Sequence, residues 1–301
     1  MGERASTAVS EKADGLVEGH ALLTVTTDEE RILDLSMVPI DDGRECPILA
    51  LQFHDITEDA LLRRLDEEEL QRAGDLQRAL LPAPSPHVPG WSSGAVSVPA
   101  KHVGGDFYDV RVKPQDAVVS LGDVMGKGMA AGMLAVATQT ALRTNAIAMS
   151  PSSALARAAG FLDDDLRRTN AFITLAYMHV DLVSGDYQFA DAGHGLHFIL
   201  RGCTKSVEHV TSEDMPMGVG DGWRENRGTL HPGDAIVLVS DGVLELWGGT
   251  FEELRNAVDQ CAAENRGDPQ GLIEALCAGV DALSDRDDVT AVMLHRDWAD
   301  V

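Results

Sequence analysis

The chain has 301 residues, of which 44% are hydrophobic and 24% are charged, so it contains enough apolar residues for a folded core. At roughly 100–200 residues per domain, this length predicts one large domain or two modest ones. The 49 acidic residues against 24 basic residues give a formal net charge of −25, which repels nucleic-acid phosphates and anionic lipids and so argues against nucleic-acid binding and polybasic membrane docking.

The N-terminal segment and the cysteines favour a cytoplasmic protein. The opening segment, MGERASTAVSEKADG, is polar and lacks the apolar centre of a secretory signal. No run approaches the ~18 apolar residues that a membrane helix needs. The cysteines are widely spaced, without a CxxC pair or zinc-site spacing: Cys46, Cys203, Cys261 and Cys277. We therefore expect reduced cysteines and no membrane anchor.

Three segments near the N-terminus alternate polar and apolar side chains in the manner of strands. They cover 20–27, 31–40 and 47–57, and the turn-rich sequences TDEER and DDGREC separate them. This pattern predicts a small antiparallel sheet, which is short for a stable domain by itself.

Residues 58–81 are predicted to form a helix, with Thr57 as its cap and Pro82 as its end. Apolar residues recur on average 3.6 positions apart along it: Leu62, Leu65, Leu70, Ala73, Leu76 and Leu80. The outer face is strongly charged. A solvated linker helix and a dimerising signalling helix are both compatible with this pattern, and both interpretations stay open.

Prolines at 82, 84, 86 and 89 predict a stiff extended segment and the main domain boundary. One compact α+β unit is expected after it. Its strands are predicted at 117–123, 172–181, 187–192, 196–200, 235–241 and 289–294. Its helices are predicted from about 128 to 145 and from starts near 150, 250 and 268. Paired strands that alternate with paired helices indicate sheets covered by helices.

Aspartates recur where an apolar strand meets a flexible turn, at Asp106, Asp123, Asp241 and the pair Asp287–Asp288. Strand ends are rigid, and adjacent glycines let the backbone approach a ligand closely. Carboxylates that share a cleft repel one another and favour a divalent cation. Oxygen ligands without a Cys or His set suit Mg²⁺ or Mn²⁺ better than Zn²⁺, and two such ions could activate water against a phosphate. Each aspartate alone could equally be a turn residue.

Six segments in order resemble the metal-dependent Ser/Thr phosphatases of the PPM (type 2C) family, and more narrowly its bacterial SpoIIE/RsbU-like branch. The segments are LQRALLP (76–82), PAKHVGGDFYDV (99–110), LGDVMGKGMAAGMLA (121–135), ADAGHG (190–195), LHPGDAIVLVSDGVLE (230–245) and DRDDVTAVML (285–294). The resemblance implies an α-β-β-α sandwich of two antiparallel sheets flanked by helices. It also implies a binuclear metal cleft at one edge of the sandwich.

The same resemblance implies a role for each acid around two Mn²⁺ or Mg²⁺ ions. Asp123 would bridge the ions, and the backbone carbonyl of Val124 would add a ligand. Asp241 and Asp287 would bind one of the ions, with Asp288 as the alternative to Asp287. Water held at the ions through Asp123 and Asp241 would attack the phosphorus of phosphoserine or phosphothreonine.

The resemblance also implies roles at three further positions. Asp106 would bind the second ion, directly or through water. Lys101 resembles in position a basic residue that many relatives place near the substrate phosphate, although an exposed surface lysine is an equal alternative. Val124-Met125 stands where eukaryotic type 2C enzymes have Gly-His, so that candidate general acid is absent here, and water would deliver the proton.

Structural roles are expected for three other polar residues in these motifs. His194 is expected to brace its hairpin rather than to act in catalysis. Asp109 is expected to be a surface acid or a residue behind the metal ligands. Lys127, between two glycines, is expected at the start of a helix.

The N-terminal strands resemble the last part of a PAS sensor domain, through RILDLSMVPIDD and LALQFHDITED. The predicted organisation is thus a partial PAS-like segment (1–57), a linker or signalling helix (58–81) and a phosphatase domain (82–297). The helix would couple an upstream sensor or activator, or a homodimer, to the metal cleft.

By resemblance, the substrate would be a phosphorylated anti-anti-sigma factor, a STAS-domain protein, in a sigma-factor partner-switching pathway. Two alternatives remain. One is a catalytically silent partner-binding module of the same fold, although all the acid positions are retained. The other is a two-metal phosphodiesterase or nuclease, which fits the acids but not the net charge of −25.

Overall fold

The computed structural model describes residues 19–26, 30–40, 48–82, 88–210, 212–280 and 287–298. The opening segment, Cys46 and the prolines at 84 and 86 lie outside the described residues. Two compact units divide the chain, Met1–Glu69 and Leu70–Val301, and each is described by itself. In the part of the chain that the structure describes, no helix combines the length and apolarity needed to cross a membrane.

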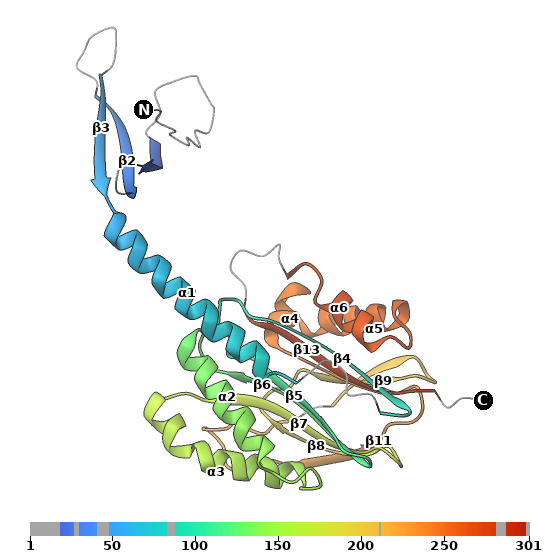
Figure 1. The fold of residues 1–301 in the computed structure, drawn as a ribbon. Helices are drawn as coiled ribbons and strands as arrows, with labels where there is room; N and C mark the ends of the chain where they lie inside the picture. Colours follow the sequence, from blue (N-terminus) through green and yellow to red (C-terminus); the bar gives the residue numbers. More distant parts are fainter. Residues whose placement is uncertain are drawn as a thin grey trace. The chain divides into compact units, whose positions relative to one another are not determined.

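The first unit contains a three-stranded antiparallel sheet, as predicted (Figure 1). Its strands are β1 (Gly19–Thr26), β2 (Glu30–Ile40) and β3 (Ile48–Asp55), with β2 in the middle. Helix α1 (Thr57–Leu80) follows, and the unit boundary falls within it. Thr57 is the first helical residue rather than a cap, because its hydroxyl accepts a hydrogen bond from the Ile32 N–H (2.8 Å) instead of from the helix.

The second unit is an α-β-β-α sandwich, which confirms the predicted fold. One antiparallel sheet has the order β11-β8-β7-β6-β5, and the other has the order β10-β9-β12-β13-β4. The first sheet comprises β5 (Phe107–Val112), β6 (Asp116–Val124), β7 (Ile173–Asp181), β8 (Asp186–Ala192) and β11 (Glu225–Thr229). The second comprises β4 (Trp91–Val98), β9 (His197–Arg201), β10 (Ser206–His209), β12 (Ala235–Val239) and β13 (Val289–Arg296).

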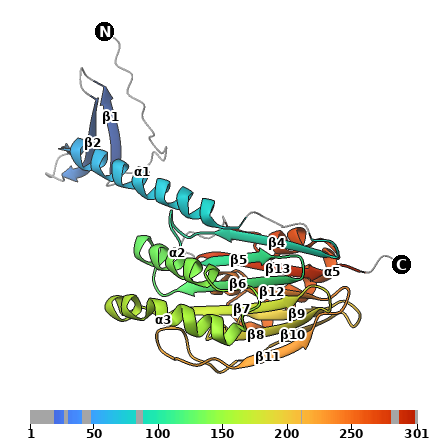
Figure 2. The ribbon, with the colours of Figure 1, turned by 60° about the horizontal axis from the view of Figure 1, so that its bottom comes forward.

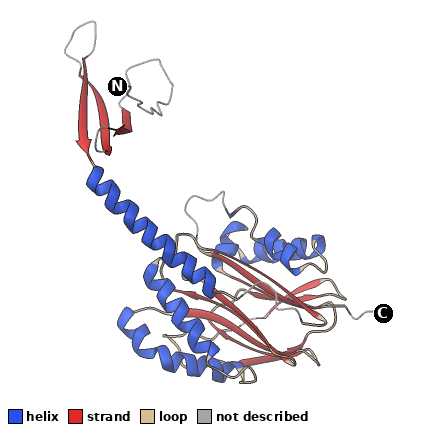
Figure 3. Cartoon of the chain, viewed as in Figure 1, coloured by secondary structure: helices blue, strands red, loops and turns tan. Residues whose placement is uncertain are grey.

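Helices cover the outer face of each sheet (Figures 2 and 3). Helices α2 (Met129–Arg143) and α3 (Pro151–Thr169) pack on the first sheet. Helices α4 (Asp241–Leu246), α5 (Phe251–Glu264) and α6 (Pro269–Leu276) pack on the second. The capping box of α5 forms as its sequence predicts, because the Thr250 hydroxyl accepts a hydrogen bond from the Glu253 N–H.

Both faces of each central strand are buried, which explains why these strands appear in the sequence as continuous apolar runs. In β6, Val119 and Leu121 face the layer between the sheets, whereas Val118 faces the α2–α3 layer. In β12, Ile236 faces the inter-sheet layer and Val237 faces the other helices. The two sheets are therefore packed rigidly against each other, and their ends can present polar groups at fixed positions.

Candidate metal centre

The acids predicted to bind metal lie where neighbouring strands meet. In an antiparallel pair, the end of one strand lies beside the start of the next. Asp123 is near the end of β6, and Asp106 immediately precedes β5, its neighbour. In the facing sheet, Asp241 follows β12 after one serine, and Asp287 and Asp288 lead into the adjacent β13. The fold therefore brings all five acids toward one region.

Asp106 is the most isolated of these carboxyl groups. It is 6% exposed, and neither of its oxygens has a hydrogen-bond partner. Burial raises its pKa well above the usual range, and the charges of Asp123 and Asp288 raise it further. The nearby hydroxyls of Ser240 and Thr290 offset this rise only in part. A buried carboxyl group in this state is either protonated or neutralised by a bound cation.

Those two hydroxyls make their own hydrogen bonds to other groups. Ser240 donates to the carbonyl oxygen of Asp288 over 3.1 Å, and its oxygen accepts the backbone N–H of Thr290 over 2.8 Å. The hydroxyls of Thr290 and Ser97 lie 3.1 Å apart. These contacts fix the backbone around the acids and leave the oxygens of Asp106 available to a ligand.

Mutual repulsion also perturbs the pKa values of Asp123 and Asp241. The pKa of Asp123 is raised to about 7, first by burial and then by the charges of Asp241, Asp287 and Asp288, while Lys127 lowers it. Burial, followed by the charge of Asp287, raises the pKa of Asp241. The acids are therefore close enough to act on one another, and a divalent cation would relieve the repulsion.

Asp288 organises the loop that leads to Asp106. Its Oδ1 accepts the Ala100 N–H over 2.6 Å, and its Oδ2 accepts the Gly105 N–H over 2.6 Å. Glycine is required at Gly104, because a Cβ there would lie 2.6 Å from the same Oδ2 atom. Oδ1 of Asp287 accepts the Asp288 N–H over 2.9 Å and its Oδ2 is paired with Lys127, so both acids have partners. Asp287 is the more accessible ligand because its side chain is 31% exposed, whereas Asp288 is 5% exposed.

Asp287 is paired with a lysine that the sequence suggested only as a helix-start residue. The Nζ atom of Lys127 lies 3.1 Å from Oδ2 of Asp287. Lys127 precedes α2, which begins at Met129 after Gly128. The only sequence indication of a special position was the pair of glycines beside Lys127. Lys101, the residue expected near the substrate phosphate, is exposed.

The donor set fits a hard divalent cation, although the acids have not converged on one point. Carboxylate and carbonyl oxygens are the ligands that Mg²⁺ and Mn²⁺ prefer, and the unpartnered oxygens of Asp106 suit such an ion. The carbonyl of Val124 faces the same loop, since a Cβ at Gly105 would lie 2.8 Å from it. Among the described residues, no group of three or more His, Cys, Asp or Glu side chains is arranged to hold a metal.

His194 has a structural position, in line with its sequence-based interpretation. Its Nε2 lies 2.9 Å from the carbonyl oxygen of Val239 at the end of β12. Asp191 accepts the backbone N–H groups of His194 (2.6 Å) and Gly195 (3.0 Å). These bonds close the turn between β8 and β9 and fix it against the neighbouring strand.

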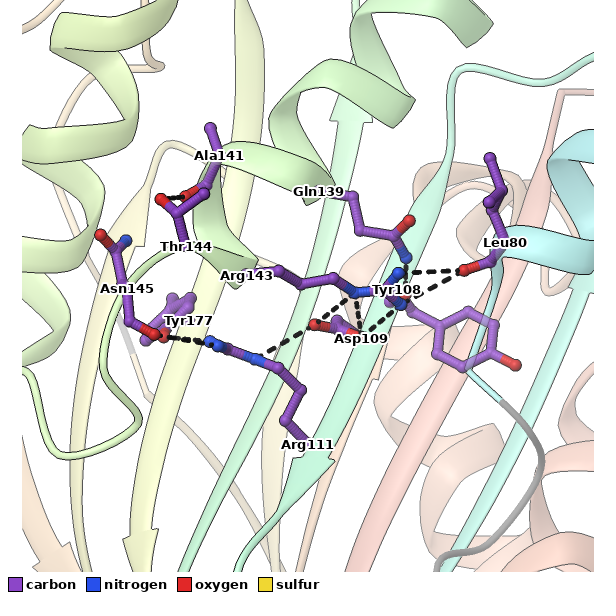
Figure 4. A network of polar contacts seen from close by, with 10 residues as sticks. All are labelled: Leu80, Tyr108, Asp109, Arg111, Gln139, Ala141, Arg143, Thr144, Asn145 and Tyr177. Atoms are coloured by element: carbon purple, nitrogen blue, oxygen red, sulfur yellow. Dashed lines mark hydrogen bonds and ion pairs between the residues drawn. The ribbon is translucent and has the colours of Figure 1, made fainter.

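Asp109, expected as a surface acid or a residue behind the ligands, is a buried ion-pair partner (Figure 4). Its Oδ1 lies 2.8 Å from Nη2 of Arg143 in the last turn of α2, and its Oδ2 lies 3.2 Å from Nε of Arg111. Arg143 also donates to the carbonyl oxygen of Leu80 over 3.2 Å. This network ties β5, α2 and the end of α1 together. The sequence could not show it, because it depends on which face of β5 meets α2.

The second half of α1, within the unit Leu70–Val301, holds the segment that leads to Asp106. Gln77 accepts the Gly104 N–H over 3.1 Å and donates to the Gly104 carbonyl over 2.8 Å. Gly74 allows close packing, because a Cβ there would lie 1.9 Å from the carbonyl oxygen of His102. The second half of α1 is therefore in direct contact with the segment before Asp106.

Comparison with known families gives a match over most of the second unit. A family model described as Stage II sporulation protein E (SpoIIE) matches residues 113–297. Among curated proteins, phosphoserine phosphatase RsbU of Bacillus subtilis is 27% identical over 191 residues, which cover 61% of this chain and 56% of the relative. The chain spans about half the length of the curated relatives that it matches.

Solved structures with the same fold were also found. The RsbU and RsbW domains of a Mycobacterium tuberculosis protein are 26% identical with a TM-score of 0.61, covering 71% of this chain and 62% of that one. The SiaA-PP2C domain of Pseudomonas aeruginosa is 20% identical with a TM-score of 0.66, covering 79% of this chain and 99% of that one. The latter likeness shows the fold alone.

Proposed function

Because the chain belongs to the SpoIIE family, we propose that it is a metal-dependent protein serine/threonine phosphatase. The observation that carries this proposal is the buried, unpartnered carboxyl group of Asp106, set beside Asp123 and Asp288. A bound cation would neutralise the charge of such a carboxyl group. A family relative is named as a phosphoserine phosphatase. The reaction is hydrolysis of a phosphoserine or phosphothreonine ester.

Two Mn²⁺ or Mg²⁺ ions are proposed at the acid cluster. Asp123 would bridge them, with Asp241 and Asp287 on one ion and Asp106 on the other. The carbonyl of Val124 would be an additional ligand, and Asp288 is the alternative to Asp287. When bound, such ions lower the pKa of water and stabilise charge on a phosphoryl group.

The chain's own contribution is to hold these oxygens in place before the ions bind. Asp288 fixes the loop of Asp106 through its hydrogen bonds to Ala100 and Gly105. Met125 stands where a histidine would serve as general acid, so the proton for the leaving oxygen comes from water. Lys101 stays a candidate for contact with the substrate phosphate.

The proposed substrate is a phosphorylated STAS-domain anti-anti-sigma protein, acted on in the cytoplasm. The name of the RsbU relative, and a solved relative in which RsbU and RsbW domains occur together, support a partner-switching pathway. The kinase and the substrate would be separate chains that meet this one.

Residues 1–57 are proposed as a partial PAS-like segment, 58–81 as a signalling helix and 82–297 as the phosphatase domain. An upstream sensor or activator, or a homodimer, would act on the helix. The hydrogen bonds from Gln77 to Gly104 support this proposal, because they connect the helix to the segment before Asp106. A shift of the helix would therefore move a proposed metal ligand.

The phosphatase proposal is tested by hydrolysis of p-nitrophenyl phosphate with Mn²⁺ and with a chelator. We expect turnover only with the metal, and a loss of at least about a hundredfold in Asp241→Asn. Asp164→Asn is the matched control, because it removes the same charge from a side chain on α3 that is 74% exposed. Full activity in a correctly folded Asp241→Asn protein would show that the proposal is wrong.

The silent binding module is the second candidate, and one observation favours it. Within the described ranges no three acids are arranged around a common point, and Lys127 is paired with Asp287. A silent module would bind its partner without binding Mn²⁺. Calorimetric titration of Mn²⁺ into the same proteins separates the two candidates.

A further inference from the structure

Lys127 lies beside the acid cluster, in the loop that joins β6 to α2. Its ammonium group is 3.1 Å from Oδ2 of Asp287, and the two side chains are 42% and 31% exposed. Partly exposed ion pairs contribute little to stability, because water screens both charges. This contact can therefore be exchanged for another at small cost.

Two glycines with an unusual backbone conformation flank Lys127. Gly126 and Gly128 have φ values of +100° and +84°, which side chains other than glycine rarely adopt. A Cβ at either position would meet nothing within 4 Å. The two glycines therefore set the path of the backbone on either side of Lys127.

The charges around Lys127 make it the counter-ion of the cluster. It lowers the pKa of Asp123, whereas Asp287, Asp288 and Glu245 raise the pKa of Lys127 itself. A divalent ion bound by Asp287 would take over this neutralising role. The attraction between the ammonium group and Asp287 would then be weakened.

An incoming phosphate monoester needs a positive group in this acidic region. Lysine provides a compact charge with several donors, which suits phosphate oxygens. Lys101 is exposed, and no ion pair joins it to the acids among the residues that the structure describes. Lys127 already lies beside the cluster, 3.1 Å from a proposed metal ligand.

We propose, on the basis of the phosphatase function above, that Lys127 binds Asp287 in the metal-free protein and the substrate phosphate once Asp287 binds metal. Lys127 and the metal would then compete for one carboxylate. Removal of the lysine charge should strengthen metal binding and weaken phosphate binding. A residue that only stabilises the loop would not produce these opposite effects.

The test measures binding by calorimetry, without turnover. Mn²⁺ is titrated into each protein, and inorganic phosphate is then titrated into the Mn²⁺-loaded protein. The variants are Lys127→Gln, Lys127→Arg, Lys101→Gln and Lys113→Gln. Lys113 is an exposed control in the β5–β6 hairpin, at the other end of the strands from Asp123. Melting temperatures establish that each variant is folded.

We expect Lys127→Gln to bind Mn²⁺ several-fold more tightly and phosphate about tenfold more weakly, as for the loss of one charge-assisted hydrogen bond. Lys127→Arg should keep most of the phosphate affinity, and Lys113→Gln should match the wild type.

Unchanged phosphate affinity in Lys127→Gln, in a protein that binds Mn²⁺, would overturn the inference alone. A loss of phosphate affinity in Lys101→Gln, and not in Lys127→Gln, would also overturn the inference. Wild-type protein that binds no Mn²⁺ would overturn the phosphatase proposal together with the inference.

Discussion

Asp287 and Asp288 are adjacent in the chain but have different surroundings. Asp288 is 5% exposed, and its two oxygens accept the N–H groups of Ala100 and Gly105. The side chain of Asp287 is 31% exposed, accepts the N–H of the adjacent Asp288 and is paired with Lys127. The sequence placed both at the site but could not separate them. The difference arises from the backbone of residues 100–105, which lies far away in the chain.

This difference predicts that the same substitution mainly affects stability at Asp288 and mainly affects Mn²⁺ binding at Asp287. Asp288→Asn should lower the free energy of unfolding by about 1.5–3 kcal/mol relative to Asp287→Asn, because an amide cannot accept both N–H groups. Each variant removes one charge from the cluster, so the comparison cancels the relief of repulsion. Asp287→Asn should instead lose affinity for Mn²⁺. Urea unfolding in chelator and Mn²⁺ calorimetry measure the two effects, and equal stabilities would contradict this account.

The burial of His197 predicts that the stability of the protein depends on pH, independently of the proposed metal site. His197 is fully buried against Phe189, with ring centroids 4.3 Å apart. Its pKa is lowered from 6.5 to about 3, first by burial and then by the charges of His194 and His209. Since the folded pKa is below the unfolded one, the unfolded chain binds the proton more readily. The stabilising contribution is complete above pH 6.5 and is lost as the pH falls toward 3.

Between pH 7 and pH 4.5, the wild type should therefore lose about 2–3 kcal/mol more stability than His197→Gln, which does not titrate there. Urea unfolding at the two pH values measures this difference. The same loss in both proteins would show that His197 takes up a proton freely in the folded state.

At the scale of elements, the contact between the second half of α1 and residues 102–104 links a helix to the segment that precedes Asp106. Gly74 lies at the closest approach, and Gln77 makes the hydrogen bonds. Helix propensity alone would favour alanine at position 74. The glycine is explained by the neighbouring carbonyl group of His102.

Replacement of glycine by alanine should consequently have opposite effects on stability at positions 74 and 160. Gly74→Ala should destabilise the protein by about 1–3 kcal/mol and weaken Mn²⁺ binding, because the new methyl group displaces the loop before Asp106. Gly160→Ala, in the exposed part of α3 where a Cβ meets nothing within 4 Å, should stabilise by about 0.5–1 kcal/mol. Thermal unfolding and Mn²⁺ calorimetry measure both variants. A stabilised Gly74→Ala protein would show that the helix does not pack on this loop.

Elements with apolar runs were predictable from the sequence, and polar edge elements were not. β6, β12 and β13 lie inside the sheets and were predicted close to their observed bounds. β4 and β11 are edge strands rich in small or polar residues, so periodicity does not reveal them. The predicted strand at 235–241 ends at Val239, because Asp241 begins the short helix α4.

At the scale of the whole molecule, the site exists because two stacked sheets bring four separate loops to one region. The order of the motifs predicted this arrangement through family resemblance, and the sandwich fold agrees with it. The pairing of Lys127 with Asp287, and the burial of Asp106 without a partner, depend on distances between loops. No local pattern in the sequence contains that information.

The most direct test of the binuclear phosphatase account is the stoichiometry of Mn²⁺ binding to the full chain, measured by calorimetry beside Asp123→Asn. Asp123 is the proposed bridge between the ions, and its pKa of about 7 reflects its burial and the charges of the neighbouring acids. Two Mn²⁺ ions per chain are expected in the wild type, and at least one of them should be lost in the variant. Absence of Mn²⁺ binding in the wild type, or unchanged binding in Asp123→Asn, would contradict it.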